Sequence, residues 1–309
     1  MTAPDRANAR VVTSLLPRVK ARVVLHAHRR VRGLLEGEYA AVTTGRGTDF
    51  TDLREYVRGD DVKDLDWKAS ARTGALLVKR FTAERKHHVL LVVATGRGLA
   101  AHAEVGTPKR DLAVTVAGVV GWLAVQHGDL VGLLHGDADG VHGLPPRGGE
   151  LHVERALEQV HEACSPYAAA GDLVALLRHV ARTVRCRTIL LLVCEDEEPT
   201  PEVVALLRRL AVQHEVLVAS LGDLDPTTVP AGSAAYDVDV AGGAGALPAW
   251  LRDDPVLAAE LADEATARHG RLDEALARLG IAHERVVDAD GAVRSVLALL
   301  QQHRHARGR

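Results

Sequence analysis

The chain has 309 residues and a formal net charge of −3 at pH 7. That length accommodates one large α/β domain with an accessory part, or two small domains. The near-zero charge gives no general attraction to nucleic acid or to an anionic membrane. Aromatic residues make up only 3% of the chain, which argues against a stacking platform for single-stranded nucleic acid.

Residues 1–36 form a basic segment with apolar residues at roughly helical spacing. Those residues are Val12, Leu15, Leu16, Val19, Val23 and Leu25. We expect a helical arm, either packed on the main domain or used as a basic docking surface. The segment lacks the apolar run of a signal peptide, and the longest apolar stretch, residues 112–125, is too short to span a bilayer. A cytoplasmic protein without membrane insertion is expected.

Three cysteines, Cys164, Cys186 and Cys194, are too few and too widely spaced for a zinc or thioredoxin-like motif. We interpret them as isolated core thiols in a reducing compartment.

The hydrophobic pattern divides the rest of the chain in two. Residues 37–86 are dense in Gly, Asp and Arg and predict short strands and turns. Residues 87–309 alternate strands with helices, which predicts one mainly parallel, Rossmann-like α/β sheet with helices on both faces. The expected strands are 88–94, 130–135, 188–194 and 215–220, with an edge strand at 141–144 and a last strand at 281–287.

The expected helices of this α/β domain carry recognisable end signals. Thr107 is the expected N-cap of a helix over 108–127, with Pro108 in its first position. Thr200 is the expected N-cap of the helix that begins at Pro201. Further helices are expected over 150–163, 172–184, 255–279 with a break near Gly270, and 292–303. Residues 221–254 are expected to form a loop, and residues 303–307 a frayed tail.

The most informative segment is a run of aspartates interleaved with basic residues between positions 45 and 74. It contains Asp49-Phe50, Leu53-Arg54-Glu55-Tyr56, Gly59-Asp60-Asp61, Asp66-Trp67 and Ala71-Arg72-Thr73-Gly74. Alternating charges at this density favour hydrogen-bonded pairs, and Gly59 before two aspartates indicates a tight turn. We predict a partly buried network of Asp60, Asp61, Asp66, Arg54 and Arg72, with Trp67 packed beneath it.

This order of residues closely resembles the signature of domain-of-unknown-function family 58, and with the following β-α alternation the resemblance covers about residues 33–300. It implies a von Willebrand factor A-like domain and a bacterial setting beside a MoxR-type AAA+ ATPase, for which such proteins are suspected adaptors. The signature, including Tyr56 and Gly59, either clamps the appendage to the main domain or docks the partner.

The chain departs from the pattern at the metal site of von Willebrand factor A domains, which is Asp-x-Ser-x-Ser after the first strand. Here the corresponding positions are Ala94, Gly96 and Gly98, so three oxygen ligands are missing. The residual acids Glu195 and Asp196 follow a later strand but make a poor cage for Mg²⁺. No metal and no other cofactor is therefore expected.

No catalytic motif accompanies these departures. The chain has no Gly-x-Ser-x-Gly and no His-Glu-x-x-His, and its sixteen histidines are scattered. Gly96-Arg97-Gly98 offers amides and a cation to an anion, yet a vacated site filled by a loop is the simpler interpretation. A hidden Ser–His pair stays open, because such residues meet only in space.

These observations favour a non-catalytic adaptor or scaffold with a degenerate metal site, working with a protein partner, the ATPase. The contact surface would be the carboxyl edge of the sheet or the signature segment. The alternative is a hydrolase or metal-dependent enzyme with an unrecognised active site. A pocket uniting Ser, His and carboxylates favours the enzyme, whereas a dry pocket plugged by Arg97 favours the adaptor.

Overall fold

A computed structural model describes residues 14–26, 34–40, 50–57, 65–81, 86–230, 237–239, 248, 250 and 254–307. Its centre is a six-stranded sheet in the order β10-β9-β8-β3-β6-β7. These strands are β3 (His88–Ala94), β6 (Leu130–Asp137), β7 (Gly140–Arg147), β8 (Ile189–Glu195), β9 (Glu215–Leu221) and β10 (Ala282–Val286). All neighbours pair in parallel except β7, which runs antiparallel to β6 at the edge. The predicted α/β fold is confirmed.

Alternation along the central strand β3 divides the core into two layers. Because successive side chains of a strand point to opposite faces, Val89, Leu91 and Val93 enter one apolar cluster. Leu90, Val92 and Ala94 enter the other. Both faces are covered, which is why the sequence of β3 is apolar throughout.

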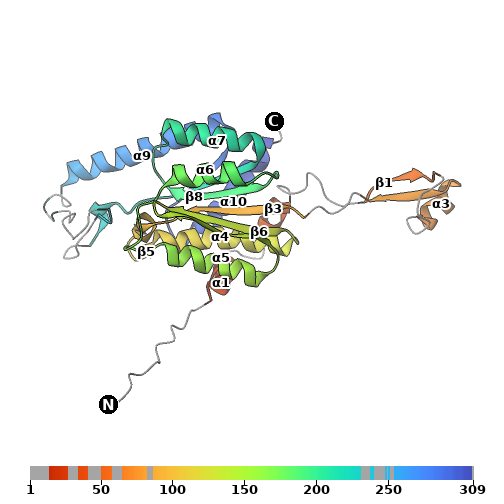
Figure 1. Ribbon diagram of the computed structural model, residues 1–309, viewed down its shortest axis with the longest axis horizontal. Coiled ribbons are helices and arrows are strands. Elements are labelled where there is room, and N and C mark those ends of the chain that lie inside the picture. The colour runs from red at the N-terminus through yellow and green to blue at the C-terminus, as the bar shows by residue number, and fades with distance from the viewer. Residues whose placement is uncertain are drawn as a thin grey trace, which may run out of the picture.

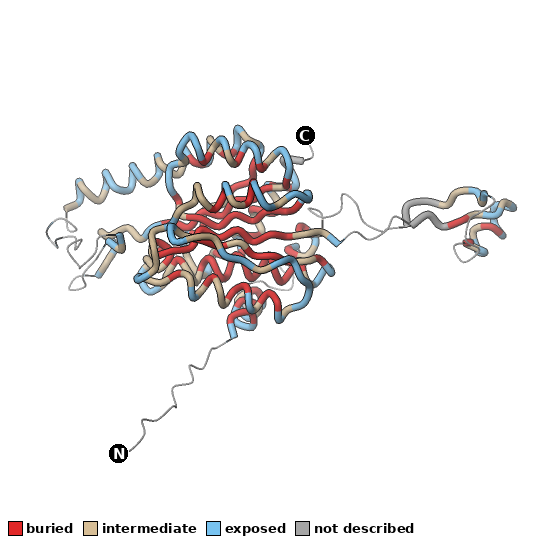
Figure 2. Tube along the Cα trace, viewed as in Figure 1, coloured by how far each residue is buried: buried red, intermediate tan, exposed pale blue. Residues whose placement is uncertain are grey.

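Helices cover both faces of the sheet (Figure 1). On one face lie α1 (Leu15–His26), α4 (Lys109–Gln126), α5 (Glu150–Ala163) and α10 (Ala292–Arg307). On the other lie α6 (Leu173–Thr183), α7 (Pro201–Gln213) and α9 (Pro255–Arg278). Figure 2 shows the buried residues concentrated on the strands and on the helix sides that face them. None of the described helices combines the length and apolarity needed to cross a bilayer.

Helix α1 lies within the basic N-terminal segment and packs against α4 and α5. The backbone amides of Leu15 and Leu16 donate to the Glu154 carboxylate of α5 at 2.6 and 2.7 Å. These bonds satisfy two amides that a helix N-terminus leaves unpaired. Lys20 adds an ion pair with Glu150 at 2.6 Å. This part of the segment is thus packed on the α/β domain.

A short helix over 34–40 spans the predicted boundary at residue 36, and the described part of residues 41–86 contains β1 (Phe50–Glu55), α3 (Trp67–Thr73) and β2 (Leu77–Phe81). Strands β1 and β2 pair antiparallel, and Leu65 bridges to Val78. Figure 1 shows β1, α3 and β2 as a small unit apart from the large sheet. The three-part division into 1–36, 37–86 and 87–309 stays a prediction.

Several predicted helix ends are wrong in detail. Pro108 rather than Thr107 is the N-cap of α4, because Thr107 pairs in the short hairpin of β4 (His102–Glu104) and β5 (Thr107–Pro108). Helix α9 runs through Gly270 without a break. Helix α10 continues to Arg307, and its His303 is buried close to Glu215, so this tail is not frayed. The Thr200 cap of α7 is confirmed by its bond from the Val203 amide.

Two of the three cysteines are buried as expected, but Cys186 is exposed in the connection before β8. The glycine run at 242–245 lies outside the described residues. The described part of the predicted 221–254 loop includes a short helix, η3 (Pro226–Thr228), that Asp225 caps.

Candidate functional site at the carboxyl edge

The candidate site lies where β3 and β8 end. These strands are neighbours at the centre of the sheet, and the direction in which successive strands are added reverses between them. Open α/β sheets bind ligands at this switch point because the connections on either side diverge there. We call the ends of β3, β6, β8, β9 and β10, with the loops beside them, the carboxyl edge. After β3 the chain enters the short helix η2 (Arg97–Ala100), and after β8 it continues into Glu195 and Asp196.

Backbone atoms close the position of Gly96. Its φ of 129° lies in the region that favours glycine. A Cβ there would lie 2.7 Å from the carbonyl oxygen of Ala169, to which the Arg97 amide donates at 3.0 Å. The loop around residue 169 therefore packs directly on the turn after β3, where the Asp-x-Ser-x-Ser pattern would place its serines.

The Glu195 carboxylate fills the space beside Gly98. A Cβ on Gly98 would lie 2.0 Å from Glu195 Oε1, so the absence of a side chain gives this carboxylate its room. Ala94, the remaining position of the predicted degenerate metal motif, is buried in the apolar cluster beneath α6 and α7.

Lys109, the first residue of α4, places its ammonium group between two carboxylates. Its Nζ lies 2.7 Å from Glu195 Oε2 and also pairs with Asp223, which follows β9. The Lys109 side chain is only 2% exposed. Burial alone would lower the pKa of Lys109, but Glu195 and Asp223 more than offset burial, and the pKa is raised. An internal cation thus neutralises the carboxylate next to Gly98.

Lys109, and not Arg97, is the cation that the edge uses. Arg97 turns outward, with its Nε 2.9 Å from Asp239 Oδ1, in a pair that is open to solvent. Arg97 therefore does not form the plugged pocket that would favour an adaptor over an enzyme. One signal pointed to Lys109: a cation in the first turn of an apolar helix is unfavourable with the helix dipole, unless anions compensate it.

Because these features occupy the edge, we expect Mg²⁺ to find no site here. Millimolar Mg²⁺ should leave the melting temperature of the full chain unchanged, since a ligand that binds only the folded state would raise it. Thermal denaturation with and without Mg²⁺ measures this. A clear upward shift that Asp196→Ala abolishes would contradict the prediction.

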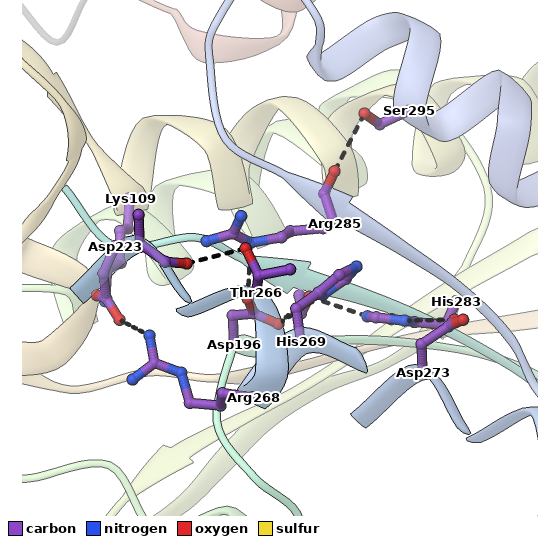
Figure 3. A network of polar contacts seen from close by, with 12 residues as sticks. Lys109, Asp196, Asp223, Thr266, Arg268, His269, Asp273, His283, Arg285 and Ser295 are labelled. Atoms are coloured by element: carbon purple, nitrogen blue, oxygen red, sulfur yellow. Dashed lines mark hydrogen bonds and ion pairs between the residues drawn. The ribbon is translucent and has the colours of Figure 1, made fainter. Parts of the chain in front are cut away.

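Asp196 is the centre of a second polar group (Figure 3). Its side chain is fully buried, with Oδ2 2.6 Å from Arg285 Nε. Its Oδ1 accepts from the Ser220 hydroxyl at 3.0 Å and lies 3.3 Å from His269 Nδ1. The ends of β8, β9 and β10 and the middle of α9 supply these four residues.

Ser220 also contacts His283, and His283 contacts Asp273. The Ser220 Oγ lies 2.9 Å from His283 Nε2, and His283 Nδ1 lies 3.3 Å from Asp273 Oδ1. Burial lowers the pKa of His283, against the opposing effect of Asp273. This is the kind of hidden Ser–His pair that the sequence left open, and no local motif reveals it because 63 residues separate the two.

A cleft of about 840 Å³ opens beside this group. Its wall includes Arg285, Arg268 and Thr266, and Asp223 separates it from Lys109. Figure 3 shows Arg268 and Lys109 approaching Asp223 from opposite sides. The carboxyl edge thus presents a solvent-filled depression lined by both charges.

The described signature residues serve local structure. Asp66 is the N-cap of α3 and accepts from the amides of Lys68 and Ala69 at 3.0 and 2.9 Å. The Tyr56 amide donates to the Leu76 carbonyl at 2.8 Å, and Arg54 donates to the Glu55 carbonyl at 3.2 Å. Arg72 is exposed. Gly59, Asp60 and Asp61 lie outside the described residues.

Trp67 is not the predicted buried anchor, because 64% of it is exposed. It follows the cap residue Asp66 directly and is the first residue of α3. The small Ser70 fills the contact between α3 and β2 instead, and its hydroxyl accepts from the Leu77 amide at 2.8 Å. A helix this short has one inner side, and Ser70 occupies it.

Two solved structures resemble the chain at low identity. One is an aerotolerance-related membrane protein from Bacteroides fragilis, at 14% identity and a TM-score of 0.39 over 70% of this chain and 99% of that chain. The other is a von Willebrand factor type A protein from Catenulispora acidiphila, at 12% and 0.39 over 73% and 44%.

Sequence comparison gives the family. Uncharacterized proteins of Mycobacterium bovis and Mycobacterium tuberculosis are 30% identical over 211 residues, which cover 66% of this chain and 64% of theirs. The chain therefore spans less than two thirds of the length of these relatives. The model of the family described as protein of unknown function DUF58 matches residues 52–238, which include the signature from Asp52 onward. The chain belongs to the DUF58 family.

Proposed function

We propose that the protein is a non-catalytic adaptor that binds a protein partner, a MoxR-type AAA+ ATPase, through the carboxyl edge or the signature segment. The observation that carries the proposal is Lys109 paired with Glu195 and Asp223. A fixed ammonium group balances the charge that a metal ion would balance, so the edge needs no cation to keep its shape. The proposed binding is therefore independent of Mg²⁺.

Exposed aromatic residues support a protein partner. The chain has only nine Trp, Tyr and Phe residues, and three of those whose burial the structure describes are largely exposed. Tyr167 is 97% exposed, Trp250 72% and Trp67 64%. Tyr167 lines a depression at the carboxyl edge together with Thr95 and His135. Aromatic side chains dominate the energy of protein interfaces, so this distribution is typical of a binding surface.

Replacing Tyr167 with Ser should weaken capture of the ATPase about tenfold or more, and leave the melting temperature unchanged. The side chain buries nothing in the free protein, whereas an interface aromatic typically contributes more than 1 kcal/mol. The measurement is the dissociation constant between the full chain and a purified MoxR-type ATPase of the same organism, in EDTA without nucleotide.

Val212→Ser is the matched control, because Val212 is 80% exposed at the end of α7, on the opposite edge of the sheet. Equal affinity of the Tyr167 variant and the wild type would remove the carboxyl edge from the interface. Capture that appears only with Mg²⁺ would contradict a metal-independent adaptor.

A serine hydrolase is the second candidate, favoured by the sequence of contacts Ser220–His283–Asp273. Two facts place it second. Ser220 is fully buried, and its hydroxyl donates to Asp196. A nucleophilic serine must reach its substrate and give its proton to the histidine. Labelling of Ser220 by a fluorophosphonate, absent in Ser220→Ala, would favour the hydrolase over the adaptor.

A further inference from the structure

We infer that Asp196, His269 and His283 form a binding site for a divalent transition metal, Zn²⁺ being the best match to the ligands. One ligand atom of each residue lies within 4.8 Å of the others. Two imidazoles and one carboxylate suit zinc or iron, whereas Mg²⁺ prefers an all-oxygen shell. The site is distinct from the lost motif at Ala94, Gly96 and Gly98, and it does not depend on the proposed adaptor role.

The spacing of the donor atoms fits a tetrahedral ion. Asp196 Oδ1 lies 3.3 Å from His269 Nδ1. Bonds of about 2.0–2.2 Å to zinc place neighbouring ligands about 3.3–3.5 Å apart. The Ser220 hydroxyl lies between Asp196 and His283, 3.0 Å from Asp196 Oδ1 and 2.9 Å from His283 Nε2. An ion here would displace that hydroxyl by a small rotation or bind beside it.

The tautomer of His283 decides how the hydrogen of the Ser220 hydroxyl is shared. Ser220 has one hydroxyl hydrogen, yet the lone pairs of Asp196 and His283 both face it when His283 carries its proton on Nδ1, towards Asp273. His269 Nδ1 meets Asp196 at the same point. In that tautomer the Ser220 hydrogen goes to Asp196, and the Nε2 lone pair of the buried His283 has no proton to accept, so a cation would satisfy it.

The surrounding residues are those that orient metal ligands. Asp273 Oδ1 lies 3.3 Å from His283 Nδ1, the arrangement in which a carboxylate fixes the tautomer of a ligating histidine. Arg285 Nε holds Asp196 Oδ2 at 2.6 Å, which leaves Oδ1 for the ion. Such outer partners are built around metal sites because they fix ligand orientation and raise basicity.

The three proposed ligands differ in burial, so that two are enclosed and the third faces solvent. Asp196 is fully buried, and the side chain of His283 is 1% exposed, so two ligands are held rigidly. The side chain of His269 is 33% exposed, on α9. Arg285, which pairs with Asp196, lines the 840 Å³ cleft. The third ligand can therefore close the site from the solvent side.

The test is Zn²⁺ binding to the full chain, purified through a tag without histidine and stripped with a chelator. We expect one Zn²⁺ per chain by calorimetry, a higher melting temperature with Zn²⁺ but not with Mg²⁺, and visible absorption when Co²⁺ replaces Zn²⁺. His269→Ala should weaken binding at least tenfold, and Asp273→Asn about 10–100-fold. Both positions are accessible, so the variants should fold.

His161→Ala is the matched control, because His161 is 35% exposed and faces a carboxylate, Asp111, at 3.9 Å without a second histidine. It should bind Zn²⁺ as the wild type does. Unchanged affinity in His269→Ala would assign the zinc to another part of the chain and overturn the site. No binding by the wild type, or equal stabilisation by Mg²⁺, would overturn it as well.

Discussion

Replacing Lys109 with Met should lower the free energy of unfolding by about 2–4 kcal/mol, near the lower end of the cost of breaking a buried ion pair. The Lys109 side chain is 2% exposed and holds two carboxylates. Met keeps much of the volume but removes the ammonium group between Glu195 and Asp223, and it leaves Asp223 with the more distant Arg268, at 3.9 Å. Asp223 is 45% exposed and can regain water, which keeps the effect below the largest values. Chemical denaturation gives the number.

The control is Arg278→Met, which removes a pair with Glu274 in which both side chains are about three quarters exposed. That change should alter stability by less than about 0.5 kcal/mol, because exposed pairs contribute little. Adding Glu195→Gln to Lys109→Met should recover part of the loss, since it removes one uncompensated charge. Equal losses of unfolding free energy in Lys109→Met and Arg278→Met would show that Lys109 is not a structural cation.

The sign of the pH dependence follows from the raised pKa of Lys109. A group with a higher pKa in the folded state stabilises the protein fully below the unfolded value, here 10.5. The stabilisation is lost as pH rises through the folded value. The difference in stability between wild type and Lys109→Met should therefore be constant near neutrality and shrink only in alkaline solution above pH 10.5.

Rebuilding the metal motif with Ala94→Asp, Gly96→Ser and Gly98→Ser should destabilise the protein by about 3 kcal/mol or more, and create no Mg²⁺ site. Backbone strain at Gly96 contributes about 1–3 kcal/mol, and a carboxylate at the buried Ala94 adds to it. At Gly98 a side chain displaces Glu195 from Lys109. Denaturation curves with and without Mg²⁺ measure both results.

Gly106→Ser separates strain from crowding. Gly106 also has a positive φ, 83°, but no atom lies within 4 Å of a Cβ placed there. It should cost only about 1–2 kcal/mol, the penalty for a left-handed conformation. Gly96→Ser alone should cost more, because it meets the Ala169 carbonyl. Equal costs at Gly96 and Gly106 would mean that the Ala169 carbonyl yields to a side chain at position 96. Stabilisation of the triple variant by Mg²⁺ would mean that the turn after β3 adapts to a metal.

The main sheet was predictable because its signals are local. A strand buried on both faces must be apolar along its whole length, and β3 is. Thr200 before Pro201 carries the chemistry of a helix start within two residues. The absence of oxygen-bearing side chains at Ala94, Gly96 and Gly98 was equally visible, because it concerns one short run of residues.

The polar groups of the carboxyl edge were not predictable, because tertiary structure assembles them. Lys109 meets Glu195 across 86 residues, and Ser220 meets His283 across 63. Histidines that look scattered along the chain come together when β9, β10 and α9 align their ends. The prediction for Trp67 was wrong for a local reason. Its hydrophobicity predicted a core residue, whereas its position directly after the N-cap of α3 leaves it exposed.

The docking of α1 has a consequence for the order of events during synthesis. The amide of Leu15 bonds to Glu154, which the ribosome adds 139 residues later. At roughly 5–20 residues per second, α1 waits on the order of 7–28 seconds for that carboxylate. Throughout that interval its apolar side, with Leu16, Val19 and Val23, has no partner from α5. A nascent-chain chaperone would therefore meet this helix before the domain does.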